Sequence, residues 1–260
     1  MLLLAGLAVS CALPHPAEPV RLRVLSYNIH HGQGNDGVFD LERIARLIEE
    51  LDPDLVALQE VDQGTGRAAG VLQADELARL TGLHGRFGRA IEYDGGEYGE
   101  AALSRLPILE TRRLGLPAAP EHELRCALLL RLAPAGEELL FLATHLDHTR
   151  DHADRVAQMG AILAGLAAEP RTPVILVGDL NCQPGSPPLA LLGPEWLDAP
   201  LAAGADQPTY PAVGPEIRID HVLVRPAARW RVLEARVIPE ELVSDHRPLL
   251  VVLELLPERP

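Results

Sequence analysis

Five short motifs place acid, amide or imidazole side chains directly beside an apolar run, and this arrangement constrains the fold more than any other feature of the chain. A short apolar run bounded by polar residues is typical of a strand buried in a sheet. Open α/β sheets expose side chains into a crevice at the ends of their strands. The motifs therefore predict a sheet edge rich in polar groups: Tyr27-Asn28-Ile29-His30-His31, Gln59-Glu60, Gly178-Asp179-Leu180-Asn181, Ile219-Asp220-His221 and Ser244-Asp245-His246.

Helices and strands alternate in the first half of the chain, whereas strands dominate its end. Apolar residues at helical spacing predict helices over 40–51, 71–80 and 151–167, with Asp40 as the N-cap of the first. Apolar runs predict strands over 22–28, 55–58, 101–103, 126–132, 139–143, 174–177, 221–224 and 249–255. We expect surface loops over 84–100, 112–123 and 183–216, the last with a short helix around 189–192. This order favours a layered α/β fold with mixed sheets.

The composition limits the classes of function. The chain has 260 residues, 47% of them apolar, which is enough for one large α/β domain or two smaller ones. Its net charge is −14 and it has no lysine, which disfavours non-specific binding to nucleic acid because such binding needs many cations. Aromatic residues make up only 3%, which argues against a base-stacking platform. The cysteines lack the spacing of a structural zinc site.

The N-terminal segment resembles an export signal. Residues 1–13 are almost wholly apolar but too short to cross a membrane, which takes roughly 20 residues. Ala8-Val9-Ser10-Cys11 resembles a bacterial lipoprotein cleavage box with Cys11 as the lipidated residue, although no basic residue precedes it. We expect 1–20 to be a signal or lipoprotein-type segment and tether, and 21–260 to be the functional domain. The protein would then be exported or membrane-anchored; a misassigned N-terminus would leave it cytoplasmic.

The polar motifs are expected to converge on one rim. Five of their residues lie at or just after the C-terminal ends of predicted strands, and three lie just before strands. In antiparallel pairing the start of one strand lies beside the end of its neighbour, so both groups can meet. The residues after strands are Asn28, Glu60, His145, Asp179 and Asn181; those before strands are Asp220, Asp245 and His246.

This set of side chains is suited to metal-assisted hydrolysis. Carboxylate and amide oxygens are ligands that Mg²⁺ prefers, and Glu60 is the strongest single metal candidate. Asp220 offers a carboxylate that orients His246 and raises its basicity. The alternative reading is structural: a lone Glu after a strand is usually a solvated turn residue, and Asp179 with Asn181 also suits an Asx turn.

Six motifs in this order resemble the endonuclease/exonuclease/phosphatase superfamily, the DNase I-like metal-dependent phosphoesterases. The resemblance spans nearly all of 21–256 and implies a four-layer α/β sandwich with two central mixed sheets flanked by helices. It also implies a magnesium-dependent site at one edge, with Mn²⁺ as a substitute. The motifs are Ser26-Tyr27-Asn28, Gln59-Glu60, Thr144-His145-Leu146, Gly178-Asp179-Leu180-Asn181, Arg218-Ile219-Asp220 and Ser244-Asp245-His246.

The resemblance also implies a role for each residue. Asn28, Glu60 and Asp245 would hold or surround Mg²⁺, Asp179 would orient or deprotonate the attacking water, and Asn181 with His145 would contact phosphate oxygens. His246, held by Asp220, would bind the phosphate or act as the base, and the choice of base between Asp179 and His246 stays open. Two positions depart from the family pattern: His30 stands where some members carry an acid near the metal, and Glu100 stands where Asn is frequent.

Three functions compete. The acidic composition and the N-terminus favour a monomeric phosphodiesterase or phosphatase acting on a lipid headgroup, such as that of a phospholipid, or on another small phosphoester. A nuclease acting on DNA or RNA is the first alternative, and its contacts would come from Arg86, Arg89, Arg105, Arg112 and Arg113. The second alternative is a catalytically silent binding protein of the same fold, which the near-complete set of polar residues argues against.

Overall fold

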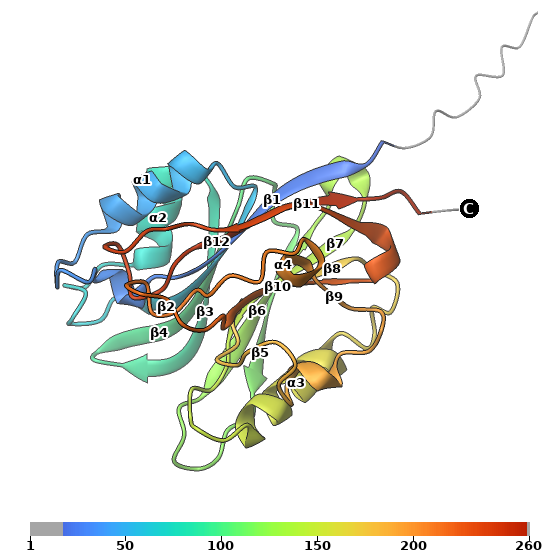
Figure 1. The fold of residues 1–260 in the computed structure, drawn as a ribbon. Helices are drawn as coiled ribbons and strands as arrows, with labels where there is room; N and C mark the ends of the chain where they lie inside the picture. Colours follow the sequence, from blue (N-terminus) through green and yellow to red (C-terminus); the bar gives the residue numbers. More distant parts are fainter. Residues whose placement is uncertain (1–17, 259–260) are drawn as a thin grey trace, which may run out of the picture.

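Two six-stranded sheets face each other in the computed structural model, which describes residues 18–258 (Figure 1). The first sheet has the order β11-β12-β1-β2-β4-β3 and the second the order β5-β6-β7-β8-β10-β9. Strands of the first sheet are β1 (Val20–Asn28), β2 (Leu55–Gln63), β3 (His84–Tyr93), β4 (Gly96–Ser104), β11 (Trp230–Val237) and β12 (Leu249–Leu255). Strands of the second are β5 (Glu110–Leu116), β6 (Arg125–Leu132), β7 (Leu139–His145), β8 (Val174–Asp179), β9 (Leu197–Asp198) and β10 (Asp220–Arg225).

Each sheet contains one parallel pair at its centre. β1 runs parallel to β2 and β7 runs parallel to β8, and the remaining pairs are antiparallel. The prediction of two mixed sheets is therefore confirmed. The central strands are buried on both faces, which is why they read as continuous apolar runs rather than as alternating ones.

An apolar layer fills the space between the sheets. Along β1, Leu22 and Val24 point into this layer, where they join Phe141 of β7 and other fully buried side chains. The alternate residues of β1, Leu25 and Tyr27, point to the opposite face and pack beneath the helices. Because both faces of β1 are covered, the position of its polar end is fixed by packing on each side.

Helices cover the outer face of each sheet and complete four layers (Figure 1). α1 (Leu41–Leu51) begins as predicted at Asp40, whose side chain accepts a hydrogen bond from the Arg43 amide. It packs with α2 (Gln73–Thr81) on the first sheet, and α3 (Ala153–Gly165) covers the second. The short elements are α4 (Ala199–Ala202) and the 3-10 turns η1 (His30–Gly32), η2 (Pro134–Gly136), η3 (Leu189–Leu191) and η4 (Ala227–Arg229).

Two of the three expected loops are wrong. The segment 84–100 forms most of a long hairpin, β3–β4, and the segment 112–123 contains the second half of β5. β3, β5 and also β11 lie at sheet edges, where one face meets solvent. Apolar residues are sparse in β3 and β5, whose strand character comes from pairing with a neighbour and leaves little trace in the local sequence. Apolar residues are more frequent in β11, but Leu233 and its polar residues are exposed. The short helix expected near 189–192 is present as η3.

The N-terminal predictions concern residues that the structure mostly leaves undescribed. The expected signal or lipoprotein segment, including Cys11, lies outside the described residues, which start at 18. Val20 already pairs with Leu255 of β12. The first strand, expected over 22–28, therefore begins two residues earlier, just before the expected start of the functional domain at 21. Among the described helices, none combines the length and apolar character needed to cross a membrane.

The topology explains why the polar motifs meet. β7 and β8 are parallel, so His145 and Asp179 end their strands side by side, and β10 is antiparallel to β8, so its first residue Asp220 lies opposite Asp179. In the first sheet, Asn28 and Gln59 are likewise neighbours in the parallel pair β1–β2. The candidate residues thus lie at one edge of the sandwich.

Gly178 permits this close approach of β8 to β7, and its replacement should be costly. Its φ is +152°, and an added Cβ would lie 1.8 Å from the carbonyl oxygen of Thr144. We expect Gly178→Ala to lower the free energy of unfolding by about 3 kcal/mol or more because backbone must shift. Gly160→Ala is the matched control: its Cβ would meet nothing within 4 Å, so it should stabilise α3 by about 0.5–1 kcal/mol. Urea denaturation checks both, and equal stability of the two variants would contradict the argument.

Candidate active site

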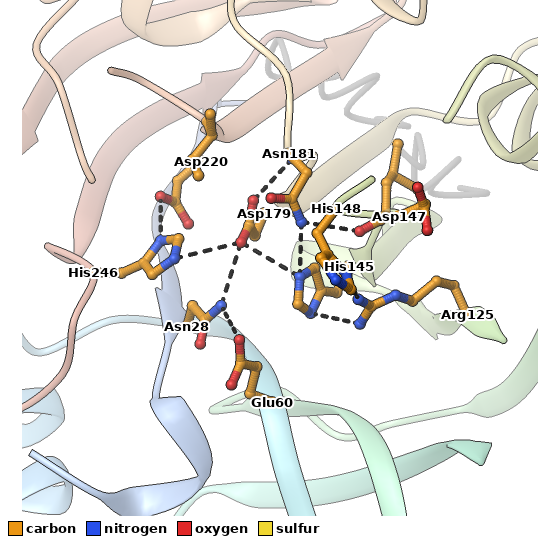
Figure 2. A network of polar contacts seen from close by, with 12 residues as sticks. Asn28, Glu60, Arg125, His145, Asp147, His148, Asp179, Asn181, Asp220 and His246 are labelled. Carbon is orange, nitrogen blue, oxygen red and sulfur yellow. Dashed lines mark hydrogen bonds and ion pairs between the residues drawn. The ribbon is translucent and has the colours of Figure 1, made fainter. Parts of the chain in front are cut away.

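Asp179 stands at the centre of the polar cluster. Its carboxylate is buried, and its Oδ2 lies 3.3 Å from Asn28 Nδ2, 3.5 Å from His145 Nε2 and 3.6 Å from His246 Nε2 (Figure 2). Its other oxygen accepts a hydrogen bond from the amide of Asn181 at 2.9 Å. Groups from both sheets thus meet on one carboxylate, as the sequence predicted.

Glu60 occupies an unusual backbone position. The sequence placed it after a strand, but β2 continues to Gln63, and Glu60 lies inside it at a β-bulge where the register with β4 shifts between Leu58 and Val61. Its φ is +59°, in the left-handed region that a non-glycine residue seldom adopts. Bulges next to active sites re-aim side chains, and here the bulge brings Glu60 to the cavity.

Asn28 links this bulge to Asp179. Its Nδ2 donates to Glu60 Oε1 at 3.0 Å and to Asp179 Oδ2, while its Oδ1 accepts from the His30 amide at 3.0 Å. Ser244 supports the same residue by donating its hydroxyl to the Asn28 carbonyl at 2.7 Å. Asn28 therefore orients two carboxylates, one from each sheet.

His246 is held by two carboxylates. Its Nδ1 lies 3.0 Å from Asp220 Oδ2, so the expected pairing with Asp220 is present, and its Nε2 faces Asp179. Burial lowers the pKa of His246, but the charges of Asp220 and Asp179 outweigh burial and raise it to about 10. Burial raises the pKa of Asp179, only partly offset by the charge of His246. The imidazole is thus cationic at neutral pH and Asp179 is a weaker acid than usual.

Glu60 stays ionised. Burial raises its pKa, but the nearby His31 ring and the hydrogen bond from Asn28 help to hold it well below its usual range. His31 Nδ1 lies 4.0 Å from Glu60 Oε2. An ionised carboxylate facing a cavity is suited to hold a cation.

His145 presents a hydrogen-bond donor to the site. Arg125 Nη1 lies 3.1 Å from His145 Nδ1, and because a guanidinium only donates, Nδ1 must accept and the ring proton must sit on Nε2. Asn181 Nδ2 lies 2.9 Å from that same Nε2 and also donates to the Leu146 carbonyl. Two N–H groups therefore converge, an arrangement that the oxygen of an anion satisfies.

Arg125 is the main residue that the sequence analysis missed. It begins β6, is only 3% exposed, and contacts both His145 and His148. The sequence did contain a signal for it: Arg125 directly precedes an apolar run that has to be buried, so the arginine at its start is expected to be buried as well. A buried cation needs a partner, and Glu123 Oε1 lies 2.9 Å from Arg125 Nη1.

A cavity of about 690 Å³ opens over this cluster. Glu60, His145, Asp179, Asn181 and His246 line it, and Asp245 lies on the same wall, whereas Asn28 and Asp220 stand behind. The donors fit a hard divalent cation: Glu60 and Asp245 supply carboxylates, and Asn28 orients Glu60. One potential ligand atom each from Glu60, His30 and His31 lies within 4.8 Å of the other two.

Glu100, which departs from the family pattern, lies behind this site. It stands opposite the β2 bulge, is fully buried, and neither carboxylate oxygen forms a hydrogen bond with the described residues. Burial raises its pKa well above the usual range, and the charge of Arg125 offsets this rise only in part.

Asp220 should be the group that keeps His246 protonated. Asp220→Asn preserves shape and removes charge, so we expect the pKa of His246 to fall by at least about one unit, or about 1.4 kcal/mol. The measurement is an NMR titration of the ring protons in metal-free protein. The ring signals of His84, which is exposed on β3, are the reference and should have the same chemical shifts in both proteins. An unchanged titration of His246 would show that Asp220 does not stabilise its charge.

Comparisons with known proteins agree with this geometry. The chain matches a curated protein of Escherichia coli (strain K12), the uncharacterized protein YbhP, at 26% identity over 94% of this chain and all of that protein. A crystal structure of an endonuclease/exonuclease/phosphatase from Beutenbergia cavernae DSM 12333 superposes with a TM-score of 0.77 at 26% identity, covering 91% of this chain and 72% of that one.

More distant structures share the fold. The mannosyl-6-phosphatase Bt3783 of Bacteroides thetaiotaomicron VPI-5482 has a TM-score of 0.72 at 22% identity, covering 89% of this chain and 99% of that one. Truncated TDP2 of Caenorhabditis elegans has a TM-score of 0.68 at 21% identity, covering 90% of this chain and 97% of that one. The model of the Endonuclease/Exonuclease/phosphatase family matches residues 25–246. The chain therefore belongs to the endonuclease/exonuclease/phosphatase family, a family of divalent-metal-dependent hydrolases of phosphate esters.

Proposed function

We propose that the protein is a Mg²⁺-dependent phosphoesterase that hydrolyses a small phosphoester, or the phosphoester of a lipid headgroup, by direct attack of water. One observation carries the proposal: buried Asp179 lies between His145 and His246 at a cavity that Glu60 also lines. In the proposed mechanism these residues would supply a proton acceptor, two hydrogen-bond donors and a cation ligand around one space. No serine or cysteine stands in a nucleophile motif, so water is the simplest nucleophile.

Glu60 and Asp245 would hold the Mg²⁺, with Asn28 orienting Glu60, and Mn²⁺ would substitute. When bound, the cation would neutralise charge on the phosphoryl group and make water a better nucleophile. The chain's own contribution is to keep Glu60 ionised and aimed at the cavity through the bulge in β2.

His145 and Asn181 would bind the phosphate. Asn181 Nδ2 lies 2.9 Å from His145 Nε2, and Arg125 leaves the ring proton of His145 on this Nε2. Donors that are already in place cost no reorganisation when charge develops on the phosphoryl oxygens.

Asp179 is favoured over His246 as the base. A base must be unprotonated at the start of the reaction, and Asp220 together with Asp179 keeps His246 protonated. Burial makes Asp179 a stronger base than an ordinary aspartate, and its position beside His246 and Asn28 would orient a water. His246 would then donate a hydrogen bond to a phosphoryl or leaving oxygen.

The ion pairs of the surface arginines and the negative net charge of the chain both favour a small substrate over a nucleic acid. Arg89 pairs with Glu92 and Glu97, and Arg105 pairs with Asp52 and Asp54, so their charges are already balanced. The five arginines considered for a nuclease all lie outside the lining of the cavity. The similarity to a mannosyl-6-phosphatase supports a small phosphoester, and export with a lipid at Cys11 would bring the enzyme to phospholipid headgroups.

Activity should depend on a divalent cation. We expect EDTA to reduce hydrolysis of bis-p-nitrophenyl phosphate to background, and Mg²⁺ or Mn²⁺ in excess of the chelator to restore it, because the anionic ester repels an uncompensated nucleophile. The measurement is release of nitrophenol by the full chain, with far-UV circular dichroism showing that EDTA leaves the fold intact. Hydrolysis that survives exhaustive chelation would overturn the metal assignment.

Replacing the proposed base should abolish turnover and identify the substrate class. We expect Asp179→Asn to lower kcat by about 10²–10⁴-fold, the range for loss of a general base. Glu60→Ala and His246→Ala should also lower activity by orders of magnitude. The matched control is Asp75→Asn, exposed on α2, which should retain full activity.

The assay compares plasmid DNA, abasic DNA, sphingomyelin, phosphatidylinositol and bis-p-nitrophenyl phosphate, with Mg²⁺. Cleavage of lipid or generic diester without cleavage of DNA is the expected result. Cleavage of DNA that Asp179→Asn abolishes would make the protein a nuclease, and full activity of Asp179→Asn would remove Asp179 from the mechanism.

A further inference from the structure

One wall of the cavity has no role in the proposed reaction. It is formed by the segment between β7 and α3, whose side chains His148, Thr149, Arg150 and His152 all line the cavity. A cavity of about 690 Å³ lies in the range, roughly 300–1,000 Å³, that encloses whole small-molecule ligands. It therefore has room for more of a substrate than one phosphoryl group.

Buried Arg155 holds this segment in shape. Its Nη1 donates to the carbonyls of Asp147 at 2.6 Å and Thr149 at 2.7 Å, and its Nη2 donates to the carbonyl of Asp151 at 2.6 Å. The carboxylate of Asp147 also accepts a hydrogen bond from the Thr149 amide at 2.8 Å. Because the carbonyls turn inward to Arg155, the backbone of the segment is ordered without any ligand.

Two arginines also fix which histidine nitrogens donate. Arg125 Nη2 lies 3.1 Å from His148 Nδ1, and Arg155 Nε lies 3.1 Å from His152 Nδ1. A guanidinium has no acceptor, so each Nδ1 must accept and each ring must carry its proton on Nε2. In His221 the same arrangement also includes an acceptor for the ring proton. Arg218 contacts its Nδ1 at 3.1 Å, and its Nε2 donates to the Cys182 carbonyl at 2.8 Å.

The charge on this wall is not fully balanced by the protein. Arg125 is paired with Glu123, and Arg155 lies 3.9 Å from Asp147 Oδ1. Arg150, in contrast, is exposed and forms no hydrogen bond or ion pair with any residue from 18 to 258. In a chain of net charge −14, a cation beside two N–H donors in the main cavity indicates an anionic partner.

We propose that His148, Arg150 and His152 form a second anion subsite, and that the substrate is a small molecule carrying a second phosphate group beside the phosphoester that is cleaved. The proposal rests on the proposed function, since it assigns the other phosphate to His145 and Asn181. Arg125 connects the two sites, because one guanidinium contacts both His145 Nδ1 and His148 Nδ1 at 3.1 Å. The two phosphates would therefore lie close together in one molecule.

A polynucleotide also carries neighbouring phosphates, but the structure favours a small molecule. A polynucleotide needs cations along an extended track, whereas Arg89 and Arg105 on the outer surface are already paired with carboxylates. Arg86, Arg112 and Arg113 also form no ion pair with the described residues, but they lie outside the cavity, whereas Arg150 lines it.

The test compares two ligands that differ by one phosphate. Calorimetry with Mg²⁺ would measure the binding of propyl phosphate and of 1,3-propanediol bisphosphate to the full chain carrying Asp179→Asn, which prevents turnover. We expect the bisphosphate to bind at least about 10-fold more tightly, as one additional set of charge-assisted hydrogen bonds gives. Adding Arg150→Ala, or His148→Ala with His152→Ala, should reduce that ratio to near one.

The control is Arg86→Ala, which removes an equally exposed arginine outside the cavity and should leave the ratio unchanged. A ratio near one before any subsite change, or a ratio that Arg150→Ala leaves intact, would overturn the subsite. The same calorimetry would be repeated with oligothymidylate, a single-stranded nucleic acid. If Arg150→Ala abolished binding of oligothymidylate but kept the preference for the bisphosphate, the assignment of the subsite to a small molecule would be overturned. Failure of the proposed function would give a different result. The unchanged protein would then show no Mg²⁺-dependent hydrolysis, whereas the subsite is tested by binding to Asp179→Asn, which does not depend on turnover.

Discussion

The site depends on one buried carboxylate, that of Asp179. A lone charge in an apolar sandwich is costly, so the fold has to surround it with partners. These are Asn28 from the first sheet, His145 from the second sheet, to which Asp179 itself belongs, and His246 from the segment before β12. These partners are far apart in the sequence and share no local element. Their meeting requires both sheets to be packed in one relative position.

The apolar layer between the sheets fixes that position. Side chains such as Val24, Phe141 and Val177 fill it without exposure to water, and close-packed interiors resist sliding. Four strands that enter this layer, β1, β7, β8 and β10, have a polar residue at the edge that borders the cavity: Asn28, His145, Asp179 and Asp220. The division is sharp: the strand interiors stabilise the fold, and the strand ends hold the chemistry.

Arginine organises this edge in a chain that has no lysine. Arg125 and Arg155 are each about 3% exposed and use several donors at once, which a planar guanidinium does better than an ammonium group. Through them the protein sets the proton positions on His145, His148 and His152. The same two residues that satisfy buried acceptors therefore decide which donors face a substrate.

The sequence by itself determined a layered α/β fold with mixed sheets and the strand-end residues, because buried strands need apolar runs and their polar ends stand out against them. The four-layer sandwich was implied by the resemblance of its motifs to a known family. It also determined that Asp40 begins α1, since an N-cap is a local interaction. It did not determine the edge strands β3, β5 and β11, whose pairing is supplied by neighbours. Only the tertiary structure placed Glu60 in a bulge and brought Arg125 and Arg155 to the cavity, because the register between β2 and β4 and the contacts of a buried guanidinium are made by residues distant in the chain.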